Sequence, residues 1–109
     1  MLFMKTEDFF NHVAGLSRIT REEEKRCAQS MAQGDPDARE KLIQNYLPQV
    51  AAHVRRLPKS LQTLRTIYGC IVALEKGVDS FNFLQDSESF SHHLSWRLRQ
   101  CTTRCLVER

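Results

Sequence analysis

The sequence predicts an all-α domain, a compact bundle of about five helices. Apolar residues recur at steps of three and four along most of the chain, which is the period of an amphipathic helix, and no long strand-like alternation occurs. Four glycines and three prolines are too few for a turn-rich β fold. The 109 residues, of which 41% are hydrophobic and 27% charged, fit one folded domain with one modest core.

Two short helices are predicted at the start of the chain. The first begins with Thr6 as its N-cap and ends at Gly15. The second begins at Thr20, where Thr20 and Glu23 match a capping box, in which each side chain satisfies a backbone N–H group of the other. Gly34 ends this second helix.

The third helix is predicted to be the longest buried element. Asp35 is a suitable N-cap, and Pro36 occupies the first helical position, where its missing N–H group is not needed. Pro48 removes a hydrogen bond inside the helix, but the apolar stripe stays in phase across it, so we expect a kink near Gln44–Pro48 and no break. Pro58 ends the helix. The stripe consists of Ala38, Leu42, Ile43, Tyr46, Val50 and Val54.

Two further helices are predicted in the second half of the chain. Ser60 is the expected cap of the fourth helix, whose apolar side is lined by Leu61, Leu64, Ile67, Ile71, Leu74 and Val78. A mostly polar loop, Asp79–Ser89, follows. The fifth helix is expected from about Ser89 to Val107, with an apolar face of Phe90, Leu94, Leu98, Cys101 and Cys105.

Several classes of protein are disfavoured by composition. The N-terminus lacks the basic and apolar segments of a secretory signal, and no apolar stretch reaches the roughly 18–20 residues that span a bilayer. We therefore expect a cytoplasmic protein with reduced thiols and no membrane partner. The four cysteines and four histidines show no zinc-site spacing, and we predict neither a metal nor a cofactor.

The net charge of +3 conceals an uneven distribution. Residues 1–36 hold five basic and six acidic side chains. Residues 37–66 hold six basic and two acidic side chains. Residues 67–89 hold one basic and four acidic side chains, whereas residues 90–109 hold four basic and one acidic. The fifth predicted helix is therefore basic, although the sum alone does not identify a nucleic-acid binder.

Two polar stripes run along this basic helix. One consists of His93, Arg97, Gln100 and Arg104, and its neighbour of His92, Trp96, Arg99 and Thr103. Arginine neutralises phosphates, glutamine can contact base edges, and tryptophan can stack on an unpaired base, so the combination suits DNA. The alternative is a solvated helix face with one tryptophan partly buried at its edge, because exposed charged faces are common.

Five motifs follow one another along the chain: Asp8–Val13, Ile19–Glu24, Gly34–Ile43, Tyr46–Val50 and Phe90–Arg104. Their order resembles the bacterial sigma-70 family of transcription initiation factors, and Phe90–Arg104 matches the promoter-melting and −10-recognition helix of that family without gaps. The resemblance covers essentially the whole chain as one domain. Residues 1–34 resemble region 1.2 of the family, and residues 35–109 resemble regions 2.1 to 2.4.

The resemblance implies a helical domain that docks on the coiled coil of the RNA polymerase β′ subunit and captures the non-template strand of the −10 promoter element. By position, Gln100 and Thr103 match residues that face the upstream end of the −10 duplex. Trp96 matches one of two adjacent aromatic residues at the melting point, and Arg99 and Arg104 match basic positions near the DNA backbone.

The sequence also departs from the family pattern. Arg97 replaces the second aromatic residue and His93 replaces the preceding tyrosine, and both changes remove stacking surface. The positions that match the polymerase-docking helix are Leu64, Arg65, Tyr68 and Gly69, where the family has acidic and amide residues. An arginine in place of an acidic residue reverses the sign of a charge contact at an interface. The Asp79–Ser89 loop is about one residue longer than in the family.

Two hypotheses follow, from different classes. The first, which we favour, is a sigma-like module that binds core RNA polymerase and −10 promoter DNA, with −35 recognition supplied by a second protein where it is required. The alternative is a degenerate, regulatory module that binds polymerase, another sigma factor or an anti-sigma factor without initiating transcription itself. We do not expect an enzyme, because no nucleophile–base pair, phosphate loop or paired-carboxylate cluster occurs in the sequence.

Overall fold

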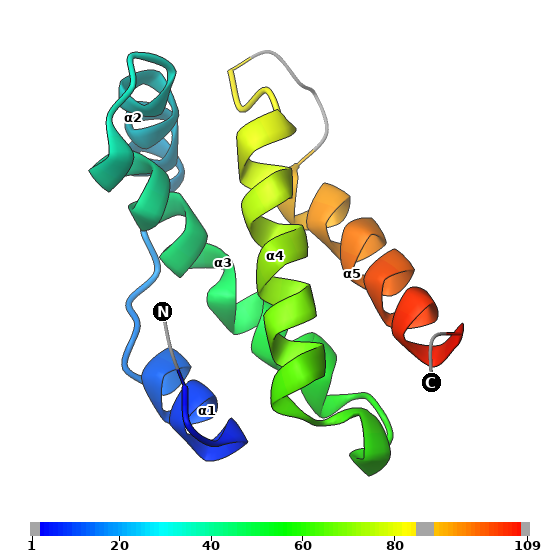
Figure 1. The fold of residues 1–109 in the computed structure, drawn as a ribbon. Helices are drawn as coiled ribbons and strands as arrows, with labels where there is room; N and C mark the ends of the chain where they lie inside the picture. The colour runs from blue at the N-terminus through cyan, green and yellow to red at the C-terminus, as the bar shows by residue number, and fades with distance from the viewer. Residues whose placement is uncertain (1–2, 85–88, 108–109) are drawn as a thin grey trace.

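The computed structural model describes residues 3–84 and 89–107 and confirms the predicted all-α bundle (Figure 1). In these residues the elements are helices, with no strand, and none of the helices is long and apolar enough to cross a membrane. The helices are α1 (Thr6–Ala14), α2 (Arg21–Ala32), α3 (Pro36–Arg55), α4 (Leu64–Ser80) and α5 (Phe90–Val107). A short 3-10 turn, Lys59–Leu61, precedes α4.

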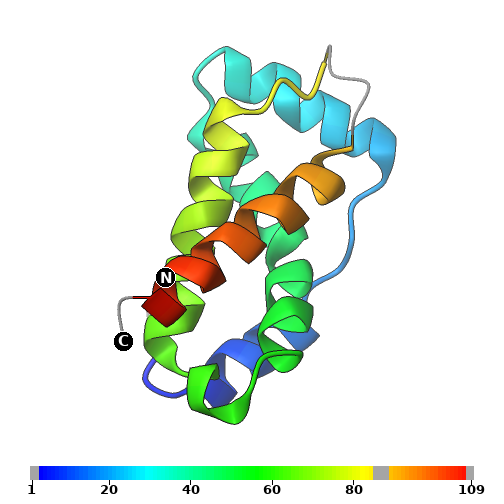
Figure 2. The same ribbon diagram turned by 90° about the vertical axis from the view of Figure 1, so that its right-hand side faces the viewer.

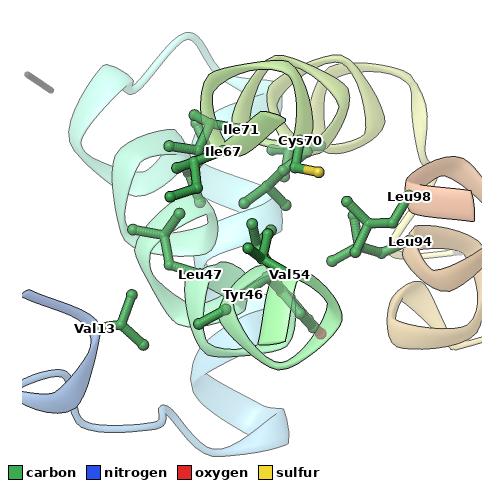
Figure 3. Close-up of a cluster of buried hydrophobic side chains, with 14 of the residues drawn as sticks. Val13, Tyr46, Leu47, Val54, Ile67, Cys70, Ile71, Leu94 and Leu98 are labelled. Carbon is green, nitrogen blue, oxygen red and sulfur yellow. The ribbon is translucent and has the colours of Figure 1, made fainter. Parts of the chain in front are cut away.

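Helix α3 is the centre of the bundle. It packs against all four of the other helices, and α1 and α2 lie at opposite ends of the molecule (Figures 1 and 2). Its buried side chains meet those of α4 and α5 in one apolar core, to which α1 adds Phe9 and Val13 (Figure 3). The α3 side chains in this core are Leu42, Ile43, Tyr46, Leu47, Val50, Ala51 and Val54. Burial of this apolar surface is the main favourable contribution to folding.

Helix α5 crosses α4 and α3 obliquely (Figure 2). Phe90, Leu94 and Leu98, each at most 2% exposed, are its anchors in the core, as the apolar spacing predicted. Glycine allows the close approach to α4, because a Cβ atom at Gly77 would lie 3.3 Å from Cδ of Arg97 and 3.4 Å from the ring of Phe90. The side chain of Cys105, predicted on the same apolar face, lies outside the described residues.

An aromatic cluster fixes the start of α5. The ring of Phe90 lies 4.7 Å from Tyr46 and 5.0 Å from Phe83, measured between centroids, and Phe81 packs against both phenylalanines. The hydroxyl of Tyr46 donates to the Glu24 carboxylate at 2.6 Å, which ties α3 to α2. Burial and this hydrogen bond raise the pKa of Tyr46 well above its ordinary value.

Most of the predicted helix boundaries are confirmed by cap geometry. The Glu23 N–H donates to the Thr20 hydroxyl at 3.1 Å, and the Asp35 carboxylate accepts from the N–H groups of Asp37 and Ala38. The α2–α3 connection turns at Gly34, whose φ of +92° is a conformation that glycine adopts without strain. These signals are local in sequence, so they could be identified without the fold.

Two predicted caps are wrong. Lys5, not Thr6, is the N-cap of α1, and its N–H donates to the Asp8 carboxylate at 3.1 Å. Thr63, not Ser60, caps α4 by accepting from the Thr66 N–H at 3.2 Å. Ser60 instead lies in the 3-10 turn, which buries Leu61 in front of the helix.

Helix α3 runs unbroken through Pro48 and ends at Arg55, before Pro58. At the other end of the molecule, α4 continues to Ser80, beyond the predicted start of the polar loop. Arg39 on α3 forms a bidentate ion pair with Asp79, at 2.7 and 2.9 Å, which holds the start of α3 beside the end of α4. Residues 85–88 of the predicted loop lie outside the described part of the chain.

Candidate nucleic-acid interface

Five of the seven predicted DNA-binding residues lie together on the outer face of α5. Because Phe90, Leu94 and Leu98 point into the core, the opposite face of the helix is turned to solvent. Its side chains line one shallow hollow, formed by Trp96, Arg99, Gln100, Thr103 and Arg104. We call these five residues the α5 face.

The α5 face combines charge, hydrogen-bonding groups and an aromatic ring. Trp96 is 52% exposed, so much of its indole ring is accessible to a partner. Arg99, Gln100 and Arg104 are exposed, and none of them has a hydrogen-bond partner or ion pair among the described residues. Thr103 is exposed as well, and its hydroxyl donates to the Arg99 carbonyl one turn earlier.

The other two predicted residues, His93 and Arg97, are turned toward α4. Arg97 donates from Nε to His93 Nε2 at 2.9 Å and from Nη2 to the Ser80 hydroxyl at 3.1 Å. Ser80 in turn donates to the Lys76 carbonyl, so the guanidinium stands at the C-terminal end of α4, where a positive charge is favourable. The ring of His93 packs on Phe81 at 5.1 Å. Both side chains therefore connect helices, and neither lines the hollow on the α5 face.

The predicted polymerase-binding residues are distributed over different environments on α4. Arg65 is exposed, whereas Leu64 packs against the core. The hydroxyl of Tyr68 accepts from the Phe3 N–H at 2.6 Å and donates to the Phe3 carbonyl at 3.1 Å, which holds the N-terminal segment. A Cβ at Gly69 would lie 3.4 Å from Sγ of Cys101 on α5. Of these four residues, only Arg65 presents its side chain freely to solvent.

A second polar surface, which the sequence did not predict, adjoins the α5 face. A cleft of about 700 Å³ lies between α3 and α5, and we call it the α3–α5 cleft. Its charged or titratable lining residues are Arg18, His53, Arg56 and Arg99, of which Arg99 also belongs to the α5 face. The sequence signals for this surface are the excesses of basic residues in the segments 37–66 and 90–109, which do not show which of these residues converge.

The wall of the cleft is held by a hydrogen-bonded amide. Gln49 on α3 donates from Nε2 to the Ser91 carbonyl at 2.8 Å and to the Ser95 hydroxyl at 3.0 Å. Its Oε1 accepts from the Ser91 hydroxyl at 2.7 Å. With both ends of the amide used, Gln49 fixes the first turns of α5 against α3, and the cleft between them is preformed.

His53 joins the far end of the cleft to α5. Its Nε2 lies 2.7 Å from the Thr102 hydroxyl, which itself donates to the Leu98 carbonyl at 3.0 Å. This short contact links His53 on α3 to Thr102 on α5. Burial, followed by the positive charges of Arg56 and Arg99, lowers the pKa of His53 below its ordinary value of 6.5.

The lowered pKa of His53 predicts a stability that decreases in mild acid. Unfolded His53 binds a proton more readily than the folded residue, so its contribution is complete above about pH 6.5 and is lost as the pH falls toward the folded pKa. Because the ring is partly exposed, we expect the effect to be under about 1 kcal/mol. Thermal unfolding at pH 7.5 and pH 5.5 should show a smaller pH-dependent loss for His53→Gln than for the wild type. An equal loss in both proteins would contradict this assignment.

No model of a known protein family matches the chain. Within residues 3–84 and 89–107, no group of three or more histidine, cysteine, aspartate and glutamate side chains is placed to hold a metal ion. The chemistry available on the α5 face and in the α3–α5 cleft is that of guanidinium, amide and hydroxyl groups around an exposed indole.

Proposed function

We propose that the protein is a sigma-like module that binds promoter DNA of the −10 type through the α5 face and docks on core RNA polymerase. The observation that carries the DNA-binding part is the convergence of Trp96, Arg99, Gln100, Thr103 and Arg104 around one exposed hollow. The motif order resembling sigma-70 factors supplies the identity of the proposed DNA element and of the polymerase partner.

The geometry of the α5 face suits a junction between duplex and single-stranded DNA. Arg99 and Arg104 are available to phosphates, since neither side chain has a partner among the described residues. Gln100 can use its amide on base edges, and Trp96 offers a ring on which an unpaired base can stack. A solvated helix face needs charge but no exposed indole beside it, so Trp96 is the feature that favours nucleic acid.

The positions of His93 and Arg97 support the alternative, a regulatory module that binds a protein without opening DNA. These two residues replace the aromatic side chains of the family pattern. Arg97 donates to Ser80 at the end of α4, and His93 accepts from Arg97 and packs on Phe81, the C-cap of α4. Outside the α5 face, α4 exposes Val72, at 46%, on the same helix as the exposed Arg65 and Lys76. An exposed apolar residue between charges is compatible with a protein contact.

Two binding measurements separate the hypotheses. The purified chain is mixed with core RNA polymerase and recovered by affinity capture, and it is titrated separately into a duplex with a single-stranded −10 segment. The initiation-module proposal expects binding in both experiments, with DNA binding lost in Trp96→Ala. Binding of core polymerase with no DNA binding, alone or in the complex, would favour the regulatory alternative. Failure to bind either partner would contradict the initiation module and would leave, of the regulatory alternative, only a module that binds another sigma factor or an anti-sigma factor.

A further inference from the structure

The α3–α5 cleft gathers positive charge from three separate parts of the chain. Arg18 comes from the connection between α1 and α2, Arg56 from the C-cap of α3, and Arg99 from the middle of α5. No residue that lines the cleft is acidic. Such convergence of like charges is unfavourable unless solvent or a bound anion screens it.

The arginines of the cleft make no ion pair or hydrogen bond that holds the described part of the chain together. In the described part of the chain the guanidinium groups of Arg18, Arg56 and Arg99 form no ion pair and no hydrogen bond. Arg39 offers a contrast within the same molecule, because its guanidinium is paired with the carboxylate of Asp79 through two hydrogen bonds. The cleft therefore keeps its charge and its donors available, while Gln49, Ser91 and Ser95 hold its wall in place.

At least two of the arginines, Arg56 and Arg99, lie close enough to His53 for their charges to affect it. The charges of Arg56 and Arg99 both lower the pKa of His53, although they belong to different helices. An anion placed beside His53 would lie within electrostatic reach of both. A guanidinium presents several N–H donors in one plane, an arrangement that matches the oxygens of a phosphate.

We propose that the α3–α5 cleft is a phosphate-binding site, formed by Arg18, Arg56 and Arg99 beside His53. Arg99 lines both the cleft and the α5 face, so the two surfaces are continuous. One source of the phosphate is a nucleic-acid strand that continues from Trp96 into the cleft, and this source rests on the proposed function. The other is a free phosphorylated ligand that competes with DNA for Arg99. The chemistry of recognition is the same in both cases.

The test uses a double variant, Arg18→Gln with Arg56→Gln, because neither residue belongs to the α5 face and neither is buried. The matched control is Arg21→Gln with Arg26→Gln, which removes the same charge at exposed positions that do not line the cleft. Circular dichroism establishes that both variants are folded. The probes are a single-stranded DNA of about 20 nucleotides and sodium tripolyphosphate.

The two probes distinguish the two sources of phosphate. If a strand enters the cleft, the double variant lowers the slope of log K against log salt for the oligonucleotide by about 1.4, from about 0.7 for each lost contact to a single strand. The control should then change the slope much less. If the ligand is a free phosphate compound, tripolyphosphate shifts the NMR signals of the His53 ring and the Gln49 amide in the wild type and the control. The double variant abolishes these shifts, and its oligonucleotide slope matches that of the control.

The proposal is overturned if the double variant and the control respond equally to both probes. That result leaves DNA binding by the α5 face intact, provided that the wild type still binds the oligonucleotide and Trp96→Ala weakens it. If instead the oligonucleotide does not bind at all while tripolyphosphate occupies the cleft, the proposed function fails and the phosphate site stands. The two failures are therefore distinguishable within one set of measurements.

Discussion

Replacement of Leu94 by alanine is expected to lower the free energy of unfolding by about 2–5 kcal/mol. Leu94 is fully buried between Phe90 and Leu98 and faces the core shared with α3 and α4. Truncation removes apolar contacts and leaves a cavity at the middle of the α5 anchor, where the neighbouring side chains cannot easily close it. Since small domains are stable by only about 5–15 kcal/mol, the variant is expected to approach the limit of folding.

Urea unfolding followed by circular dichroism measures this change. Gln100→Ala is the matched control, because Gln100 lies on the same helix and is exposed, so we expect its effect to stay within about 0.5 kcal/mol. A loss below about 1 kcal/mol in Leu94→Ala would contradict the packing described for α5. The α5 face is held in place by the burial of the opposite side of the helix, so a large loss of stability in Leu94→Ala would confirm that this side anchors α5.

The sequence was sufficient to predict the helices because their signals are local. The Thr20 and Asp35 caps, Gly34 and the apolar spacing of α5 act within one or two turns. The error at Ser60 has a different origin, since Ser60 and Thr63 are both acceptable caps and lie three residues apart. Burial of Leu61 and a hydrogen bond from the Gln62 amide to the Leu57 carbonyl, at 2.8 Å, accompany the turn that makes Thr63 the cap.

The candidate site was predictable in part for the same reason. Helical periodicity correctly indicated that Trp96, Arg99, Gln100, Thr103 and Arg104 are neighbours. It could not indicate that Arg97, one position from Trp96, turns toward α4. That orientation depends on the space left by Gly77 and on the hydroxyl of Ser80, which are distant in sequence. The α3–α5 cleft was missed because its arginines come from three segments that only the fold brings together.

Replacement of Arg104 by alanine is expected to weaken binding to every DNA sequence by a similar factor. Its guanidinium is exposed at the α5 face and has no protein partner among the described residues, so its contact with DNA would be to the phosphate backbone. Loss of one such contact lowers the slope of log K against log salt by about 0.9 for duplex DNA. A titration of several duplexes from about 50 to 200 mM salt measures both quantities.

Replacement of Gln100 by alanine should give the opposite pattern, with little change in salt dependence. If its amide contacts a base edge, preference at one base pair relaxes by roughly 1–3 kcal/mol while binding to unrelated sequences stays constant. The two exposed residues lie four positions apart on one helix face, so a general effect of helix stability would change both variants alike. Uniform loss in one and a sequence-specific loss in the other can arise only from contacts that the side chains themselves make with DNA. If neither of these variants nor Trp96→Ala alters the binding of single-stranded or duplex −10 DNA, the α5 face is a solvated surface and DNA binding by this helix is excluded.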